Sequence, residues 1–147
     1  MNYTRLVKLL AALAIFGGIA LMAQRGKIVA TGTFHGAAHS TSGRATVYSE
    51  ENGAGTLRLT HFKTSNGPNL HVLPIAAKDA QDNEDFLEKG IERVDLGPLK
   101  GNEGDQNYTI SAGPDLSKYR AVSIFCERFS VNFGGSTGEI KSLRGWA

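Results

Sequence analysis

The most constraining feature of this 147-residue sequence is an alternation of apolar and polar residues with a period of two, which begins after residue 27. Such alternation over short runs is typical of half-buried β-strands, whereas amphipathic helices repeat every three to four residues. Clusters of Gly, Asn and Pro separate the runs, as expected for turns between antiparallel strands. The predicted strands are Ile28–Phe34, Ala45–Tyr48, Leu57–Phe62, Leu70–Leu73 (ended by Pro74), Tyr108–Ile110 and Ala121–Phe133. The pattern predicts an all-β domain, either an antiparallel β-sandwich or a barrel-like sheet.

A hydrophobic segment precedes this domain. The run Leu9–Gln24 carries no charge, follows two basic residues and contains small residues near its end. This order is typical of a secretory signal peptide cut after Ala23, and also of an uncleaved helix that anchors the domain in a membrane. We therefore divide the chain into residues 1–27, a signal peptide or membrane anchor with a hydrophobic helix, and residues 28–147, the β domain. Both alternatives predict an extracytoplasmic domain, periplasmic or at the cell surface, that is secreted or membrane-anchored.

The distribution of charge argues against a nucleic-acid partner. The chain has 16 Lys and Arg residues against 14 Asp and Glu residues. Two of the basic residues, Arg5 and Lys8, precede the hydrophobic segment, so the domain that follows is formally neutral. A nucleic-acid-binding protein gathers Lys and Arg on one face, and no run in this sequence does so. We therefore expect no nucleic acid among the partners, and contact with the membrane through the N-terminal segment.

The single cysteine, Cys126, is the first candidate for chemistry. In its predicted strand, Val122, Ile124 and Cys126 share one face, and the apolar pattern changes parity around Glu127–Arg128. A β-bulge there would restore one buried face, and bulges often re-aim side chains beside functional sites. Arg128 would favour a thiolate at Cys126 if its guanidinium turned toward the sulfur. The alternative is a buried cysteine that packs as a small hydrophobic residue.

The four histidines give weaker indications. His35 and His39 are four residues apart, but their segment follows a strand and contains Gly36, so the helical spacing that suits a metal does not apply. His39 lies in a loop whose Ser and Thr neighbours can bond to the backbone and hold the imidazole in place. His61 shares a strand face with two leucines, which predicts a histidine at the edge of the core. We predict no metal site from this sequence.

Several segments, taken in order along the chain, resemble the DM-thirteen domain family, which is linked with electron transfer and is often found beside DOMON domains. The matching segments are Gly32–Phe34, His39–Gly43, Leu57–Leu59, Phe62–Leu70, Leu96–Gly101, Gly104–Tyr108, Ile124–Cys126 and Phe133–Gly134. Asn69 departs from the family pattern, which often has Asp after Gly-Pro. This departure weakens any role that needs a carboxylate at that position.

The resemblance implies a compact all-β domain whose characteristic cysteine falls on Cys126. Its implied role is redox, as a free thiol or by holding a prosthetic group such as haem, for which Cys126 and His39 are the candidate ligands. The predicted function is an exported or membrane-tethered redox or electron-transfer module, without autonomous enzymatic activity, that acts with an envelope protein or redox partner. The alternative is a non-catalytic cell-envelope binding or adhesion module that uses its loops, above all the polar connection from Ala76 to Arg93.

Overall fold

The computed structural model of the chain describes residues 26–80 and 90–140. The predicted N-terminal helix lies outside these residues, as does most of the polar connection after Ala80. Within the two described ranges, no helix is long and apolar enough to cross a membrane. The strands there are β1 (Lys27–Gly36), β2 (Thr41–Ser49), β3 (Gly55–Thr64), β4 (Leu70–Ile75), β5 (Gln106–Ile110), β6 (Ala121–Cys126), β7 (Val131–Ser136) and β8 (Glu139–Ile140).

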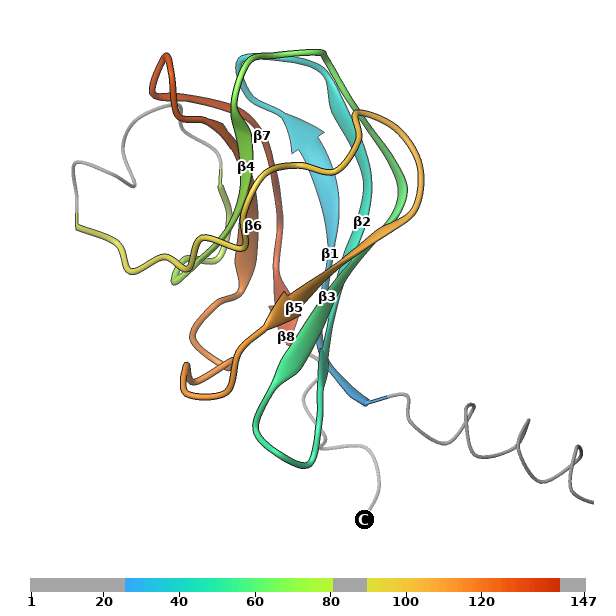
Figure 1. The fold of residues 1–147 in the computed structure, drawn as a ribbon, viewed down its shortest axis with the longest axis vertical. Coiled ribbons are helices and arrows are strands. Elements are labelled where there is room, and N and C mark those ends of the chain that lie inside the picture. The colour runs from blue at the N-terminus through green and yellow to red at the C-terminus, as the bar shows by residue number, and fades with distance from the viewer. Residues whose placement is uncertain (1–25, 81–89, 141–147) are drawn as a thin grey trace, which may run out of the picture.

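The strands form one curled antiparallel sheet. Its order is β4-β6-β7-β1-β2-β3-β5, and β8 pairs with β1 beside this path. The sheet bends so that the arm of β4, β6 and β7 faces the arm of β1, β2, β3 and β5 (Figure 1). Strand β1 joins the two arms, because its last residues pair with β7 while its earlier residues pair with β2. The predicted all-β antiparallel fold is confirmed, and its form is a half-barrel rather than a sandwich of two separate sheets.

The main core lies between the two arms. Leu57 and Leu59 of β3 and Ile124 and Cys126 of β6 belong to this cluster and are completely buried. A second cluster, which includes Phe125, covers the other face of β4 and β6, since successive side chains of a strand point to opposite faces. All six residues of β6 are therefore buried. Coverage on both faces explains why the sequence of β6, apolar except for Ser123, shows no alternation.

The last predicted strand is two strands in the structure. Strand β6 ends at Cys126, β7 begins at Val131, and the exposed turn Glu127–Ser130 joins them. Because the chain reverses in this turn, the apolar pattern changes parity without the bulge that the sequence predicts there. An irregularity of pairing does occur, but it lies earlier in β6, between Ile124 and Phe125.

His61 is exposed, so its predicted place at the edge of the core is wrong. The pairing of β2 with β3 shifts register between Ser42 and Arg44, and opposite this shift His61 adopts a left-handed backbone conformation with φ of 49°. An extra residue in one strand turns the following side chains to the other face. Phe62 consequently takes the buried position next to His61, and Asp105 accepts a hydrogen bond from the His61 amide at 2.8 Å.

The segment from Ile91 to Asp105, yellow to orange in Figure 1, runs from the outer edge of β4 toward the other arm. Its first part is tied to β4 by backbone hydrogen bonds. The Val72 amide donates to the Gly97 carbonyl at 3.1 Å, and the Leu96 amide donates to the Val72 carbonyl at 3.0 Å. These bonds cover the outer edge of β4 and place Asp95 beside this strand.

Candidate functional site

Cys126 lies in the core with none of its surface exposed. It is paired with Leu70 of β4 and Val131 of β7. Its sulfur lies 3.1 Å from the carbonyl oxygen of Pro68, so the thiol donates a hydrogen bond to the backbone of the loop before β4. The geometry is that of a cysteine packed in the core, one residue before an exposed turn.

The structure does not bring His39 or Arg128 to this sulfur. His39 is exposed, and its ring lies against Phe133 with 4.0 Å between the ring centroids. Arg128 is exposed in the β6–β7 turn, and its guanidinium lies 5.7 Å from the ring centroid of Phe129. In the described part of the chain, no hydrogen bond or ion pair joins either side chain to Cys126. Phe133, which the His39 ring contacts, belongs to the same buried cluster as Cys126.

This arrangement does not fit a haem ligated by Cys126. A haem iron has to bond directly to its axial sulfur or nitrogen ligand. The Cys126 sulfur is enclosed by core residues, and its thiol is hydrogen-bonded to the Pro68 carbonyl. An apolar pocket between the arms has a volume of only ≈ 10 Å³, about enough for one water. It is lined by Val47, Pro74, Val94, Ile110, Leu116 and Tyr119.

A second group of reactive side chains lies at the surface next to Cys126. His71 comes from β4, Asp95 from the segment along β4, and Glu127 from the turn after β6, and their nearest ligand atoms all lie within 4.8 Å of one another. Nδ1 of His71 is 2.9 Å from each carboxylate oxygen of Asp95 and 3.9 Å from Oε1 of Glu127. Nε2 of His71 is 3.2 Å from Oδ1 of Asn69. We call His71, Asp95 and Glu127 the rim cluster.

The electrostatics of the rim cluster favour an ionised Asp95. Burial alone would raise its pKa, but the hydrogen bonds from His71 and the Gly97 amide and the positive charges of His71 and Arg93 outweigh that effect. The pKa of Asp95 therefore lies below its ordinary value. The sequence analysis missed this cluster because its members are far apart in the chain. Strand pairing was the signal that could have found it, since Leu70 before His71 pairs with Cys126 before Glu127.

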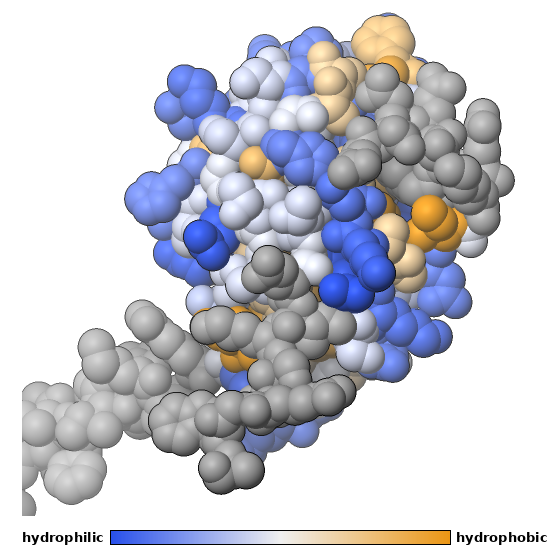
Figure 2. Space-filling view, turned by 180° about the vertical axis from the view of Figure 1, so that it is seen from behind, coloured by the Kyte–Doolittle hydropathy of each residue, from blue (hydrophilic) through white to orange (hydrophobic). Residues whose placement is uncertain are grey.

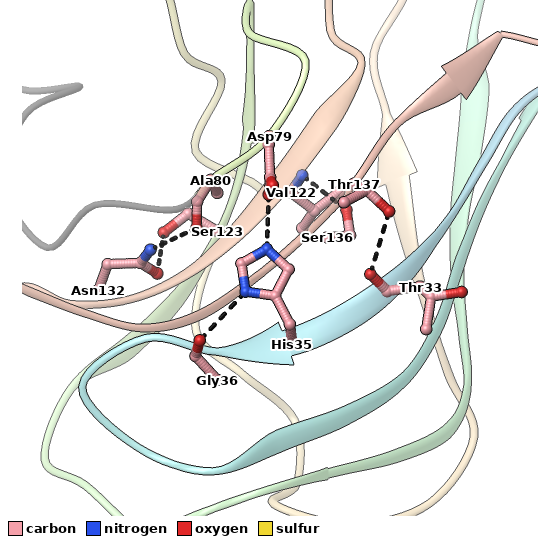
Figure 3. A network of polar contacts seen from close by, with 10 residues as sticks. All are labelled: Thr33, His35, Gly36, Asp79, Ala80, Val122, Ser123, Asn132, Ser136 and Thr137. Carbon is pink, nitrogen blue, oxygen red and sulfur yellow. Dashed lines mark hydrogen bonds and ion pairs between the residues drawn. The ribbon is translucent and has the colours of Figure 1, made fainter.

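A buried polar network lies around β6 and β7 (Figure 3). The side chain of Asn132, completely buried, accepts a hydrogen bond from the Ser123 hydroxyl at 2.8 Å and donates one to the Ala80 carbonyl at 3.0 Å. Nearby, Nε2 of His35 lies 2.5 Å from Oδ1 of Asp79. These contacts hold the residues after β4 against β1 and β7. Their role is therefore structural.

The His35–Asp79 contact also affects titration. Burial lowers the pKa of His35, but the hydrogen bonds to Asp79 and to the Gly36 carbonyl and the charge of Asp79 outweigh burial. The net effect raises the pKa of His35 above its ordinary value. The protonated imidazole is therefore favoured in the folded state.

Comparison with known proteins gives one match. A family model described as electron transfer DM13 matches residues 33–136, well over half of the chain. No match is found among curated proteins or among solved structures. The matched range contains Cys126, His39 and the whole rim cluster.

Proposed function

This chain belongs to the electron transfer DM13 family, and from that premise we propose that it is an exported or membrane-tethered redox module whose redox-active group is Cys126. The observation that carries the proposal is the position of the only thiol in this sequence. Cys126 ends β6 directly before the exposed turn Glu127–Ser130. The N-terminal hydrophobic segment would carry the domain out of the cytosol. Disulfide chemistry is favoured in the oxidising environment outside it.

The reaction would require a local opening, because the resting thiol is sealed. Two segments that border Cys126 would have to move. They are the loop ending in Asn69, whose Pro68 carbonyl accepts the thiol's hydrogen bond, and the turn Glu127–Ser130, which follows Cys126 directly in the chain. Segments with exposed residues and few core contacts open at a lower free energy than core strands. Pro68 and Asn69 are exposed, as are all four residues of the turn.

The chemistry we assign is thiol–disulfide exchange with a partner protein. After the Cys126 thiol loses its proton, the sulfur attacks a disulfide of the partner and forms a new intermolecular S–S bond. The partner's second sulfur leaves as a thiolate with the electron pair of the broken bond. Because this sequence contains no second cysteine, the mixed disulfide is resolved by a thiol of another molecule.

The test is the rate at which the folded full-length chain reacts with a chromogenic disulfide reagent, measured against urea concentration. Opening of these two segments exposes little surface, so the rate of reaction of Cys126 in dilute urea should barely depend on the urea concentration. It should also exceed the rate that global unfolding alone would allow. A rate that follows global unfolding down to zero urea would remove the proposal. Cys126→Ser is the control for reaction at any other group.

Export is tested separately. A reporter fused to the C-terminus that is active only outside the cytosol should be active with the intact N-terminal segment. Deletion of residues 1–27 should abolish that activity. Equal reporter activity with and without these residues would contradict the proposed location.

A second candidate function, a non-catalytic cell-envelope binding module, is favoured by a different observation. Phe129 in the β6–β7 turn is 63% exposed, whereas the thiol is fully buried. Exposed aromatic residues often anchor protein interfaces. On the face drawn in Figure 2, which is mainly hydrophilic, the hydrophobic residues form separate spots and no broad patch. If Cys126→Ser retains function in the cell and Phe129→Ala loses it, the binding module is correct. The opposite pattern supports the redox module.

A further inference from the structure

We propose that the rim cluster binds one divalent transition-metal ion of the Zn²⁺ class through Nδ1 of His71 and the carboxylates of Asp95 and Glu127. The inference is independent of the redox role of Cys126, because the sulfur is not one of the ligands. An imidazole nitrogen suits Zn²⁺, Ni²⁺ and Cu²⁺, whereas Ca²⁺ and Mg²⁺ prefer sites made entirely of oxygen ligands.

The distances within the rim cluster are close to those of a metal site. Zn²⁺ bonds nitrogen and oxygen at about 2.0–2.2 Å, so two ligand atoms of a tetrahedral site lie about 3.4 Å apart. In the structure, Nδ1 of His71 is 2.9 Å from the Asp95 oxygens and 3.9 Å from the Glu127 oxygen. The side chains of Asp95 and Glu127 are 45% and 44% exposed. Rotation of these two exposed carboxylates would bring the ligand atoms, which lie within 4.8 Å of one another, to that spacing, with a water as the fourth ligand.

The backbone holds the three ligands in place before any ion binds. The Glu127 amide donates to the Asn69 carbonyl at 3.2 Å, which fixes the turn against the residue two before His71. Oδ1 of Asp95 accepts a hydrogen bond from the Gly97 amide at 2.8 Å. Ligands supported in this way need little ordering when the ion arrives.

The second contact of His71 points specifically to a ligand role. A metal-binding histidine generally donates its other ring N–H to an oxygen acceptor, which fixes the orientation of the ring. Nε2 of His71 lies 3.2 Å from Oδ1 of Asn69. With Nε2–H donated to this amide oxygen, Nδ1 is the nitrogen left to face the two carboxylates. A metal ion would take the place of the proton that Nδ1 shares with Asp95.

Charge also favours a cation in this position. A neutral imidazole and two carboxylates carry two negative charges, which a divalent ion neutralises. The charges of His71 and Arg93 already act on Asp95, which shows that this carboxylate favours a positive neighbour. His71 itself is mostly enclosed, with 16% of its side chain exposed, and partial enclosure strengthens its interaction with an ion.

The experiment is calorimetric titration of the full-length chain, freed of metal with a chelator, with Zn²⁺. We expect saturable binding of one ion per chain, unaffected by an equal concentration of Mg²⁺. His71→Gln and Glu127→Gln should each weaken binding at least about tenfold. Asn69→Gly removes the amide acceptor but suits the left-handed backbone at this position, where φ is 55°, and it should weaken binding by roughly tenfold.

His61→Gln and Glu103→Gln are the matched controls, since both residues are exposed and lie outside the rim cluster. Both should bind Zn²⁺ like the parent. Absence of saturable binding, parental affinity in Glu127→Gln, or an equal loss in His61→Gln would overturn the proposal. Glu127→Gln decides if His71→Gln fails to fold. The labelling rate of Cys126 is measured on the parent chain without metal, so its outcome is read independently of the Zn²⁺ titration and the two proposals fail separately.

Discussion

Replacement of Asn132 by alanine tests the buried network that holds the residues after β4. The Asn132 side chain is completely buried and bonds to the Ser123 hydroxyl and the Ala80 carbonyl. The alanine leaves both groups buried without these partners, and each such loss costs about 1–3 kcal/mol. We therefore expect the free energy of unfolding to fall by about 2–6 kcal/mol. A domain of this size has a total of about 5–15 kcal/mol, so the change is large.

The assay for Asn132→Ala is urea unfolding followed by circular dichroism. The midpoint should move to lower urea while the dependence of the free energy on urea stays constant. Asn107→Ala is the matched control, because Asn107 is exposed on β5. Its Oδ1 accepts a hydrogen bond at the surface from the Arg58 guanidinium, at 3.1 Å. We expect the control to lose less than about 1 kcal/mol. Equal losses in the two variants would refute the structural role of the network.

Two further predictions concern the same region. Because the pKa of His35 is raised on folding, its contact with Asp79 stabilises fully below the unfolded pKa of about 6.5, and this contribution is lost as pH rises through the folded pKa. The melting temperature should therefore fall between about pH 6 and pH 8. The fall should be smaller in His35→Gln than in the parent or in the control His61→Gln. Identical pH profiles of the melting temperature would contradict this. A Cβ at Gly135 would overlap Ala80, whose carbonyl Asn132 bonds. A Cβ at Gly101 would make only an ordinary contact, at 3.6 Å. Thermal melting should show Gly135→Ala destabilised by more than about 1 kcal/mol and Gly101→Ala nearly unchanged, and similar values for the two would argue against close packing here.

The periodicity of the sequence predicts the strands that are covered on one face only. Leu57 and Leu59 point into the core while Arg58 between them is partly exposed, so β3 is visible as alternation. Alternation disappears in β6 because the second cluster covers its other face. The sequence therefore predicts one strand from Ala121 to Phe133, although Glu127 and Arg128 lie in the turn of a hairpin. Strand β4 continues past the predicted end at Pro74, because a proline is tolerated at the edge of a sheet.

The candidate site is only partly predictable for the same reason. The sequence identifies Cys126 as the only thiol and places it correctly on the face of Val122 and Ile124. It does not reveal the Pro68 carbonyl that accepts its hydrogen bond, since that contact joins residues 58 positions apart. The rim cluster depends in the same way on the pairing of β4 with β6. Long-range pairing, rather than local pattern, determines which side chains meet.

The most direct test of the redox role is the intact mass of the folded full-length chain after incubation with a small-molecule disulfide in the absence of denaturant. The account predicts one mixed disulfide, located on Cys126, that a thiol reductant removes while the fold is retained throughout by circular dichroism. An unchanged mass until denaturant is added would contradict it, because the thiol would then be only a buried core residue.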